Sequence, residues 1–108
     1  MSLFPIYQDG GYYLEYFQNS HQGLTDGKLA IEAAENLGIP SGTTIYFAVD
    51  FDAYEYQIDD FIIPYFRMID FIFKTQLNKK RYKVGVYGAR VICTKVSDRG
   101  LASYSFVG

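Results

Sequence analysis

Two aspartates come directly after the most apolar segment of the chain. Residues 43–49 are β-branched and apolar almost without interruption, and Asp50 and Asp52 follow them. An apolar run of this length is typical of a strand that is covered on both faces of a parallel sheet. Partial burial favours the protonated form of a carboxyl group, and a like charge two residues away favours it further. We therefore interpret Asp50 as a candidate general acid and Asp52 as its partner.

The same two aspartates are compatible with a metal-dependent reaction. An apolar strand that ends in Asp-x-Asp also opens the haloacid-dehalogenase-type phosphatases, and two carboxylates suit a hard cation such as Mg²⁺. Those enzymes usually continue with a small residue and Thr or Val, whereas this chain continues with Ala53-Tyr54. Their strand also opens the fold, whereas another βα unit comes first here. A Mg²⁺-dependent phosphatase is therefore a distant alternative.

Other candidate residues stand at the ends of predicted strands. Glutamine and arginine side chains occur there, together with several tyrosines. A tyrosine offers both a flat apolar face and a hydroxyl that can hydrogen-bond, and a sugar ring presents complementary surfaces. Many other ligands do so too, which leaves the type of ligand open. The candidate ligand-binding residues are Tyr7, Gln8, Tyr54, Tyr87 and Arg90.

The remaining reactive side chains are interpreted as structural. His21 is the only histidine and falls in a predicted loop, where nothing fixes its tautomer for catalysis. Cys93 is the only cysteine, which excludes an intramolecular disulfide, and we expect it to pack within a helix. A basic cluster with Lys79, Arg81 and Lys83 falls between a helix and a strand and is interpreted as a solvent-exposed loop.

Four predicted strands and three predicted helices position these residues. The strands cover residues 3–7, 43–49, 82–88 and 102–107, and the helices cover residues 27–37, 58–77 and 89–98, after a long loop at residues 10–24. Thr25 or Asp26 is expected to cap the first helix, and Pro64 to kink the second or to start a new one. The βαβαβαβ order predicts an α/β fold with a parallel sheet, whose ligands bind beyond the carboxyl ends of the strands.

The length of 108 residues allows a single domain, which we assign to residues 1–108. A closed (β/α)₈ barrel needs about 250 residues. The chain is therefore either a small open sheet or about half of a TIM-like β/α barrel. Half of a barrel leaves two bare strand edges, which need covering or else promote self-association.

Charge and hydropathy exclude several classes of partner. The chain has 10 lysines and arginines and 12 aspartates and glutamates, a net charge of −2, whereas a general nucleic-acid binder is clearly basic. No apolar run approaches the roughly 18 residues that span a bilayer. The N-terminal residues Met1-Ser2-Leu3 lack the basic segment that opens a secretory signal peptide. We therefore expect no nucleic-acid partner, no membrane span and no signal peptide in this chain.

Three motifs resemble the successive strand ends of a bacterial glycoside-hydrolase-like domain that was long catalogued as a domain of unknown function. They are Phe4-Pro5-Ile6-Tyr7-Gln8, Ile45-Tyr46-Phe47-Ala48-Val49-Asp50-Phe51-Asp52 and Tyr82-Lys83-Val84-Gly85-Val86-Tyr87-Gly88. That group is related to the family 25 glycoside hydrolases, the muramidase-type lysozymes. The resemblance covers most of the chain. It implies a TIM-like β/α barrel that acts on or binds cell-wall glycan such as peptidoglycan, in an extracellular or cell-wall location.

The chain departs from the family 25 pattern in its carboxylates. Those enzymes carry Asp-x-Glu on the strand that resembles residues 45–50, and the pair falls here on Ala48 and Asp50. An aspartate is one methylene shorter than a glutamate, and a misplacement of about 1 Å can cost catalysis 10²-fold. The resemblance also implies an interior portion of a barrel, because the family's opening strand has no counterpart before Leu3 and its later strands have none after Val107.

Three hypotheses for the function follow. In the first, the chain is a glycoside hydrolase with Asp50 as general acid and Asp52, or a carboxylate outside the chain, as partner. Glycosidases need two carboxyl groups roughly 5–9.5 Å apart, and Cα atoms at positions i and i+2 of a strand lie about 6.5–7 Å apart. In the second, it is a carbohydrate-binding module that has lost the carboxylate pair. In the third, it is a structural fragment. Neither of the first two roles needs a metal or an organic cofactor.

Overall fold

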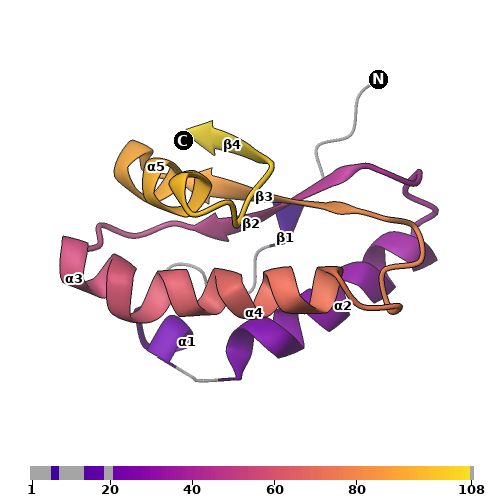
Figure 1. The fold of residues 1–108 in the computed structure, drawn as a ribbon, viewed down its shortest axis with the longest axis horizontal. Coiled ribbons are helices and arrows are strands. Elements are labelled where there is room, and N and C mark those ends of the chain that lie inside the picture. The colour runs from indigo at the N-terminus through magenta and orange to yellow at the C-terminus, as the bar shows by residue number, and fades with distance from the viewer. Residues whose placement is uncertain (1–5, 8–13, 19–20, 108) are drawn as a thin grey trace.

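Four parallel strands form one sheet at the centre of the structure. The computed structural model describes residues 6–7, 14–18 and 21–107. The strands are β1 (Ile6–Tyr7), β2 (Thr44–Val49), β3 (Lys83–Gly88) and β4 (Tyr104–Val107), and they lie in the order β1-β2-β3-β4 (Figure 1). Every neighbouring pair is parallel. The predicted α/β fold with a parallel sheet is therefore confirmed.

Helices connect the successive strands. Between β1 and β2 are α1 (Leu14–Gln18) and α2 (Gln22–Asn36). Between β2 and β3 are α3 (Glu55–Gln57), the π-helix η1 (Ile58–Ile62) and α4 (Ile63–Phe73), and between β3 and β4 is α5 (Arg90–Asp98). Helix α2 packs against α4, and α5 packs against β3, β4 and α4. Figure 1 shows α2 and α4 side by side on one side of the sheet.

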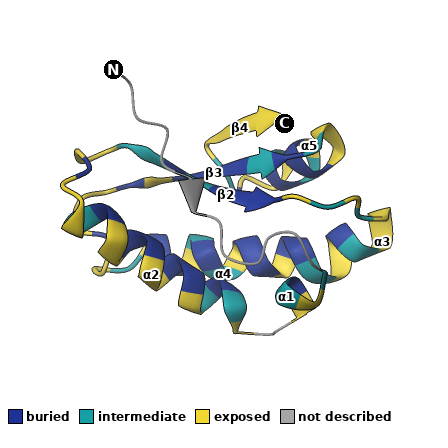
Figure 2. Ribbon diagram, turned by 180° about the vertical axis from the view of Figure 1, so that it is seen from behind, coloured by how far each residue is buried: buried dark blue, intermediate teal, exposed yellow. Residues whose placement is uncertain are grey.

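The core fills the space between the sheet and these helices. Ile45, Phe47 and Val49 alternate along β2 and are buried. The ring of Phe47 meets the rings of Phe66 and Phe73 in α4 edge to face, with centroids 6.4 and 5.8 Å apart. Burying one side chain of this size contributes about 1.5–3 kcal/mol. Figure 2 shows that α2 and α4 each have one buried and one exposed side.

Two glycines let α2 approach α4 closely. A Cβ atom on Gly23 would lie 2.3 Å from the Tyr65 carbonyl oxygen, and one on Gly27 would lie 3.2 Å from the Ile72 side chain. The first distance leaves no room for any side chain, because the backbone of α4 cannot rotate away as a side chain can. The packing of α2 on α4 therefore depends on Gly23.

The first connection differs from the sequence prediction. The sequence predicts a long loop at residues 10–24, whereas α1 and the first residues of α2 lie within that range. Neither Thr25 nor Asp26 caps α2, which begins at Gln22 after His21. The prediction is wrong because Phe17 and Gly23 are buried, so tertiary contacts and not local propensity decide the structure of these residues.

The second helical connection is interrupted. The sequence predicts one helix at residues 58–77, and the structure has three consecutive helical segments that end at Phe73. Pro64 is in the first turn of α4, one of the two predicted alternatives, where its missing N–H costs little. A π-helix within a longer helix is uncommon and often occurs near a functional site.

Candidate functional site

A cleft of about 330 Å³ opens at the carboxyl ends of β2 and β3. This is the edge of the sheet at which parallel α/β folds bind ligands. We call it the carboxyl-end cleft. It brings together two predicted catalytic residues and one predicted ligand-binding residue. The described residues of its lining are Val49, Asp50, Phe51, Asp52, Tyr87, Gly88 and Ala89.

Strands β2 and β3 leave no room for a side chain at one position where this cleft begins. Val49 and Gly88 are paired residues, each at the end of its strand. A Cβ atom on Gly88 would lie 2.6 Å from the Val49 carbonyl oxygen, so only glycine fits at this position. This pairing brings Asp50 and Ala89, the next residue on each side, into the same cleft.

Phe51 anchors the loop that carries both aspartates. Its half-buried ring packs against Phe17 of α1, with centroids 5.8 Å apart. At the end of the loop, the Tyr54 amide donates to Gln57 Oε1 (2.9 Å) and the Gln57 amide donates to the Tyr54 carbonyl oxygen (3.0 Å). The loop is therefore held at Phe51 and again at Tyr54, and the two aspartates lie on either side of Phe51.

Two expectations about the aspartates are wrong. Strand β2 ends at Val49, so the spacing of residues i and i+2 on an extended strand does not apply to Asp50 and Asp52. Both aspartates are exposed, whereas the sequence interpretation expects partial burial of Asp50. The physical reason is the bend at Phe51, which interrupts the extended chain before α3 and leaves both carboxylates in solvent.

Two stacked aromatic pairs involve predicted site residues. Tyr87 stacks on Phe106 of β4, with ring centroids 5.4 Å apart. Tyr54 stacks on Tyr56 with centroids 6.2 Å apart and ring planes 7° apart, and these two side chains are 71% and 60% exposed. Exposed aromatic rings with hydroxyl groups suit ligands that have both apolar and polar surfaces.

The other predicted ligand-binding residues are not among the described lining residues of the cleft. Tyr7 is in β1, where its backbone pairs with Phe47. Gln8 is outside the residues that the structure describes. Arg90 is exposed at the first position of α5, directly after Ala89. A role for these three residues stays a prediction.

Helix α5 supports the ends of β3 and β4 through Cys93. The buried Sγ lies 3.6 Å from the Gly88 carbonyl oxygen and 3.7 Å from the Phe106 carbonyl oxygen. Burial raises the pKa of the Cys93 thiol, which disfavours the reactive thiolate. Cys93 is therefore a packing residue, as its place in the sequence predicts.

A buried aspartate outside the cleft is missed by the sequence interpretation. Asp26 of α2 is fully buried, and its carboxylate accepts hydrogen bonds from the Tyr16 hydroxyl (2.5 Å), the Tyr65 hydroxyl (2.5 Å) and Gln22 Nε2 (2.8 Å). It thereby links α1, α2 and α4. The signal that points to it is its helical spacing from the small and apolar residues of α2, which are Gly23, Gly27, Ala30, Ile31 and Ala34.

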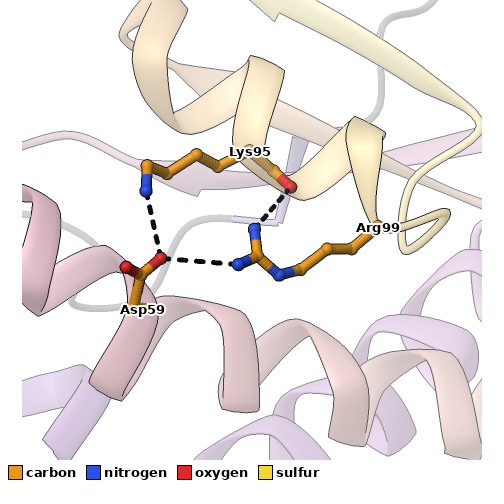
Figure 3. A network of polar contacts seen from close by, with 3 residues as sticks. All are labelled: Asp59, Lys95 and Arg99. Carbon is orange, nitrogen blue, oxygen red and sulfur yellow. Dashed lines mark hydrogen bonds and ion pairs between the residues drawn. The ribbon is translucent and has the colours of Figure 1, made fainter.

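An ion-pair network joins α5 to η1 (Figure 3). Asp59 Oδ1 lies 3.1 Å from Lys95 Nζ and 3.7 Å from Arg99 Nη2. The Arg99 guanidinium also donates to the Lys95 carbonyl oxygen (3.4 Å). The network therefore joins the helical segments that follow β2 and β3, the two strands whose ends form the carboxyl-end cleft.

Neither a metal cluster nor a membrane helix is present in the part of the chain that the structure describes. Those residues include no group of three or more His, Cys, Asp or Glu side chains that could hold a metal ion. They also include no helix with the length and apolar character needed to cross a membrane.

The fold and the cleft define an α/β domain with a candidate ligand site at the carboxyl edge of its parallel sheet. Residues 1–105 match the family described as "Rv2525c-like, glycoside hydrolase-like domain". The chain belongs to this family of glycoside-hydrolase-like domains. The resemblance expected from the three strand motifs is therefore confirmed.

The chain is similar to two proteins of Bacillus subtilis (strain 168). It is 54% identical over 110 residues to "Uncharacterized protein YbfG", an alignment that covers 99% of the chain and 15% of that protein. It is 45% identical over 107 residues to "Uncharacterized protein FadG", which covers 99% of the chain and 18% of that protein. The chain thus spans less than a fifth of the length of these relatives.

The fold is also similar to part of a solved structure. The crystal structure of the Mycobacterium tuberculosis Tat-secreted protein Rv2525c, in complex with HEPES, matches with a TM-score of 0.72 and 22% sequence identity. The match covers 86% of this chain and 43% of that one. At this level of identity the likeness concerns the fold alone.

Proposed function

We propose that the carboxyl-end cleft recognises bacterial cell-wall glycan, with peptidoglycan as the ligand. The observation that carries the proposal is that two exposed carboxylates, Asp50 and Asp52, share one cleft with Tyr87. Membership of the glycoside-hydrolase-like family supports a carbohydrate as the ligand.

The cleft offers the two kinds of surface that a sugar ring needs. Ionised carboxylates accept strong hydrogen bonds from hydroxyl groups, and the side chains of Asp50 and Asp52 are exposed to receive them. Tyr87 in the cleft lining offers an aromatic face, and the stacked rings of Tyr54 and Tyr56 add an exposed one outside that lining, at the start of α3. A volume of about 330 Å³ is at the small end for ligand pockets, which suits one sugar unit.

Binding without hydrolysis is the role that these features support best. Ala48 stands where the resemblance to family 25 places the first carboxylate, and Asp50 is exposed rather than desolvated. Both features weaken acid catalysis and leave hydrogen bonding to a sugar intact. Hydrolysis is the second candidate, with Asp50 as general acid and Asp52 or a carboxylate of another segment as partner. The presence of two carboxylates in one cleft favours it.

We further propose that the chain forms about half of a TIM-like β/α barrel related to the family 25 glycoside hydrolases. The strands lie in chain order, as they do in such a barrel, and the chain covers 43% of the solved protein with the similar fold. Other segments of a longer protein would then supply the remaining strands and the rest of the glycan site. The description of Rv2525c as Tat-secreted supports an extracellular location for this chain as well.

Pull-down on purified peptidoglycan sacculi tests glycan recognition. The wild-type chain is compared with Tyr87→Ala and with the double variant Tyr54→Ala/Tyr56→Ala. The control is Tyr104→Ala, whose side chain is 53% exposed and is not part of the cleft lining. We expect about tenfold weaker binding for the first two variants, as for aromatic anchors at other interfaces, and unchanged binding for the control. Equal binding by all four proteins contradicts the proposal.

Release of reducing sugar from the same sacculi separates the two roles. A binding module releases none, and its Asp50→Asn variant differs from the wild type only in affinity. Release by the wild-type chain that is lost in Asp50→Asn establishes hydrolysis instead, because the amide cannot donate a proton to the leaving group.

A further inference from the structure

A second and larger cleft, of about 680 Å³, lies at the opposite end of the sheet. It is formed between the end of α4 and the start of β3, and therefore at the amino-terminal end of that strand. Lys74, Lys79 and Arg81 are in its lining, and none of the described lining residues is acidic. We call it the basic cleft.

The sequence concentrates positive charge around the basic cleft. Between Asp70 and Asp98 every charged residue is a lysine or an arginine, although the whole chain has a net charge of −2. Lys74 Nζ forms an ion pair with Asp70 (2.9 Å). Lys79 and Arg81 are exposed, and within the described part of the chain neither has an ion-pair partner. These two cations are therefore available to an anion from solvent.

A buried asparagine holds the loop that carries these cations. Asn78 is 8% exposed, and its Nδ2 donates to the carbonyl oxygens of Phe73 and Tyr82 (2.9 Å each). Its Oδ1 accepts a hydrogen bond from the Tyr82 amide (2.9 Å). These bonds tie the end of α4 to the start of β3. A loop fixed in this way loses little conformational entropy when it binds a ligand.

The backbone of Arg81 has an unusual conformation. Arg81 has φ = 55°, in the left-handed region that is costly for a residue with a Cβ atom. At the other described positions with positive φ the chain has glycine, namely Gly38, Gly42 and Gly100. Glycine would relieve the strain at position 81 as well. Because Arg81 is also part of the lining of the basic cleft, its side chain is a candidate ligand for an anion there.

We propose that the basic cleft binds a phosphate-bearing anion, at a site separate from the carboxyl-end cleft. The Arg81 guanidinium presents paired N–H donors that match two phosphate oxygens, and Lys79 adds a point charge. The ligand is either free inorganic phosphate or a phosphodiester polymer, because both present the same group to the cleft. This site does not depend on the proposed recognition of glycan.

Titration calorimetry of the 108-residue chain tests this site at low ionic strength. The two probes are inorganic phosphate and poly(glycerol phosphate). We expect saturable binding with a dissociation constant on the order of 1 mM or tighter, weakened by added NaCl because these charges are exposed to solvent. Lys79→Gln and Arg81→Gly each weaken binding about tenfold. The matched control Lys28→Gln, which removes an exposed cation on α2, leaves binding unchanged.

Arg81→Gly also separates the side chain from the backbone. The melting temperature of this variant stays the same or rises, because glycine relieves the left-handed conformation, whereas its affinity for phosphate falls. Arg81→Lys keeps the charge and retains part of the affinity. If Arg81 has only a structural role, the affinity for phosphate is unchanged in both variants.

Each outcome decides for or against the basic cleft as a phosphate site. Tighter binding of the polymer identifies a phosphodiester ligand and tighter binding of the free ion identifies inorganic phosphate, and both support the proposal. An equal loss of affinity in Lys28→Gln overturns it, since the effect is then one of net charge. Unchanged affinity in Arg81→Gly, or the absence of saturable binding, overturns it as well.

Discussion

Asp26 shows what a single carboxylate does when the fold surrounds it. Three hydrogen bonds reach it from α1, α2 and α4, and no part of its side chain is open to solvent. A buried carboxylate is costly unless its lone pairs are satisfied, and here two hydroxyls and one amide satisfy them. Asp26 therefore specifies how the three helices meet.

The variant Asp26→Ala is expected to lower the free energy of unfolding by about 2–4 kcal/mol. Two tyrosine hydroxyls and one glutamine amide lose an acceptor inside the protein, and a buried donor without a partner is penalised. Urea denaturation measures the loss. Glu32→Ala, an exposed acidic residue on the same helix, is the control and is expected to change stability by less than about 0.5 kcal/mol. The same unfolding midpoint for Asp26→Ala and the wild type contradicts this role.

At the scale of residues, the sequence predicts which side chains share the carboxyl-end cleft better than it predicts their surroundings. Parallel strands bring their carboxyl ends to one edge, so Asp50 and Tyr87 are expected there from strand order alone. The exposure of Asp50 depends on the bend at Phe51, and that bend depends on a contact with Phe17 from another connection. Contacts of this kind are not encoded in local periodicity.

Helices α2 and α4 pack at a distance that only glycine permits. A helix propensity scale predicts that Gly23→Ala stabilises the chain by about 1 kcal/mol. The contact with the Tyr65 carbonyl oxygen predicts the opposite sign, because a new Cβ at 2.3 Å forces the two helices apart. We expect the steric effect to dominate and the free energy of unfolding to fall by about 1–3 kcal/mol.

Thermal unfolding of Gly23→Ala and Gly27→Ala measures this contact. Gly27→Ala is the matched control, because its new Cβ would meet the Ile72 side chain at 3.2 Å, and a side chain can shift. We expect a clearly lower melting temperature for Gly23→Ala than for Gly27→Ala. A higher melting temperature for Gly23→Ala than for the wild type shows that propensity prevails and that the helices are not in close contact.

The ion pairs between α5 and η1 are expected to contribute little stability. All three side chains are partly exposed, so solvent screens the attraction. A double-mutant cycle with Asp59→Ala and Lys95→Ala is expected to give a coupling energy of about 0.5 kcal/mol at low salt. That coupling disappears in 1 M NaCl. A coupling that persists unchanged at high salt means that the pair is desolvated in solution.

The local sequence pattern predicts the middle of the helices and strands well and their first residues poorly. Strands β2 and β3 form where β-branched and apolar residues run without a break, and α5 forms within the predicted range. Helix α1 and the start of α2 are not predicted, because residues such as Phe17 and Gly23 are held by packing against their neighbours. The new helical segment near Pro64 is one of the two outcomes that the proline predicts, whereas the π-helix η1 and the end of the helix at Phe73 are not predicted.

At the scale of the whole molecule, β4 is an edge strand with an apolar surface. Tyr104, Phe106 and Val107 are 53%, 42% and 48% exposed, and β4 pairs only with β3 among the described strands. The parallel sheet and the short length predict this open edge from the sequence alone, whereas the segment that covers it belongs to the longer protein in our proposal.

The open edge is expected to make the 108-residue chain self-associate at high concentration. Val107→Lys places a charge on the edge and is expected to shift the chain toward monomer. Val91→Lys, which places the same charge on the exposed surface of α5, is the control. Sedimentation velocity measures the distribution. A wild-type chain that stays monomeric at every concentration shows that the edge is covered by other means.

Nuclear magnetic resonance titration with a soluble peptidoglycan fragment tests whether the carboxyl-end cleft binds glycan, because it reports every backbone amide separately. We predict saturable shift changes at residues 49–52 and 87–89, which line the carboxyl-end cleft, and little change in the basic cleft at residues 73–82. Changes that are centred on residues 73–82, or no saturable change at any residue, contradict the assignment of the carboxyl-end cleft as a glycan site.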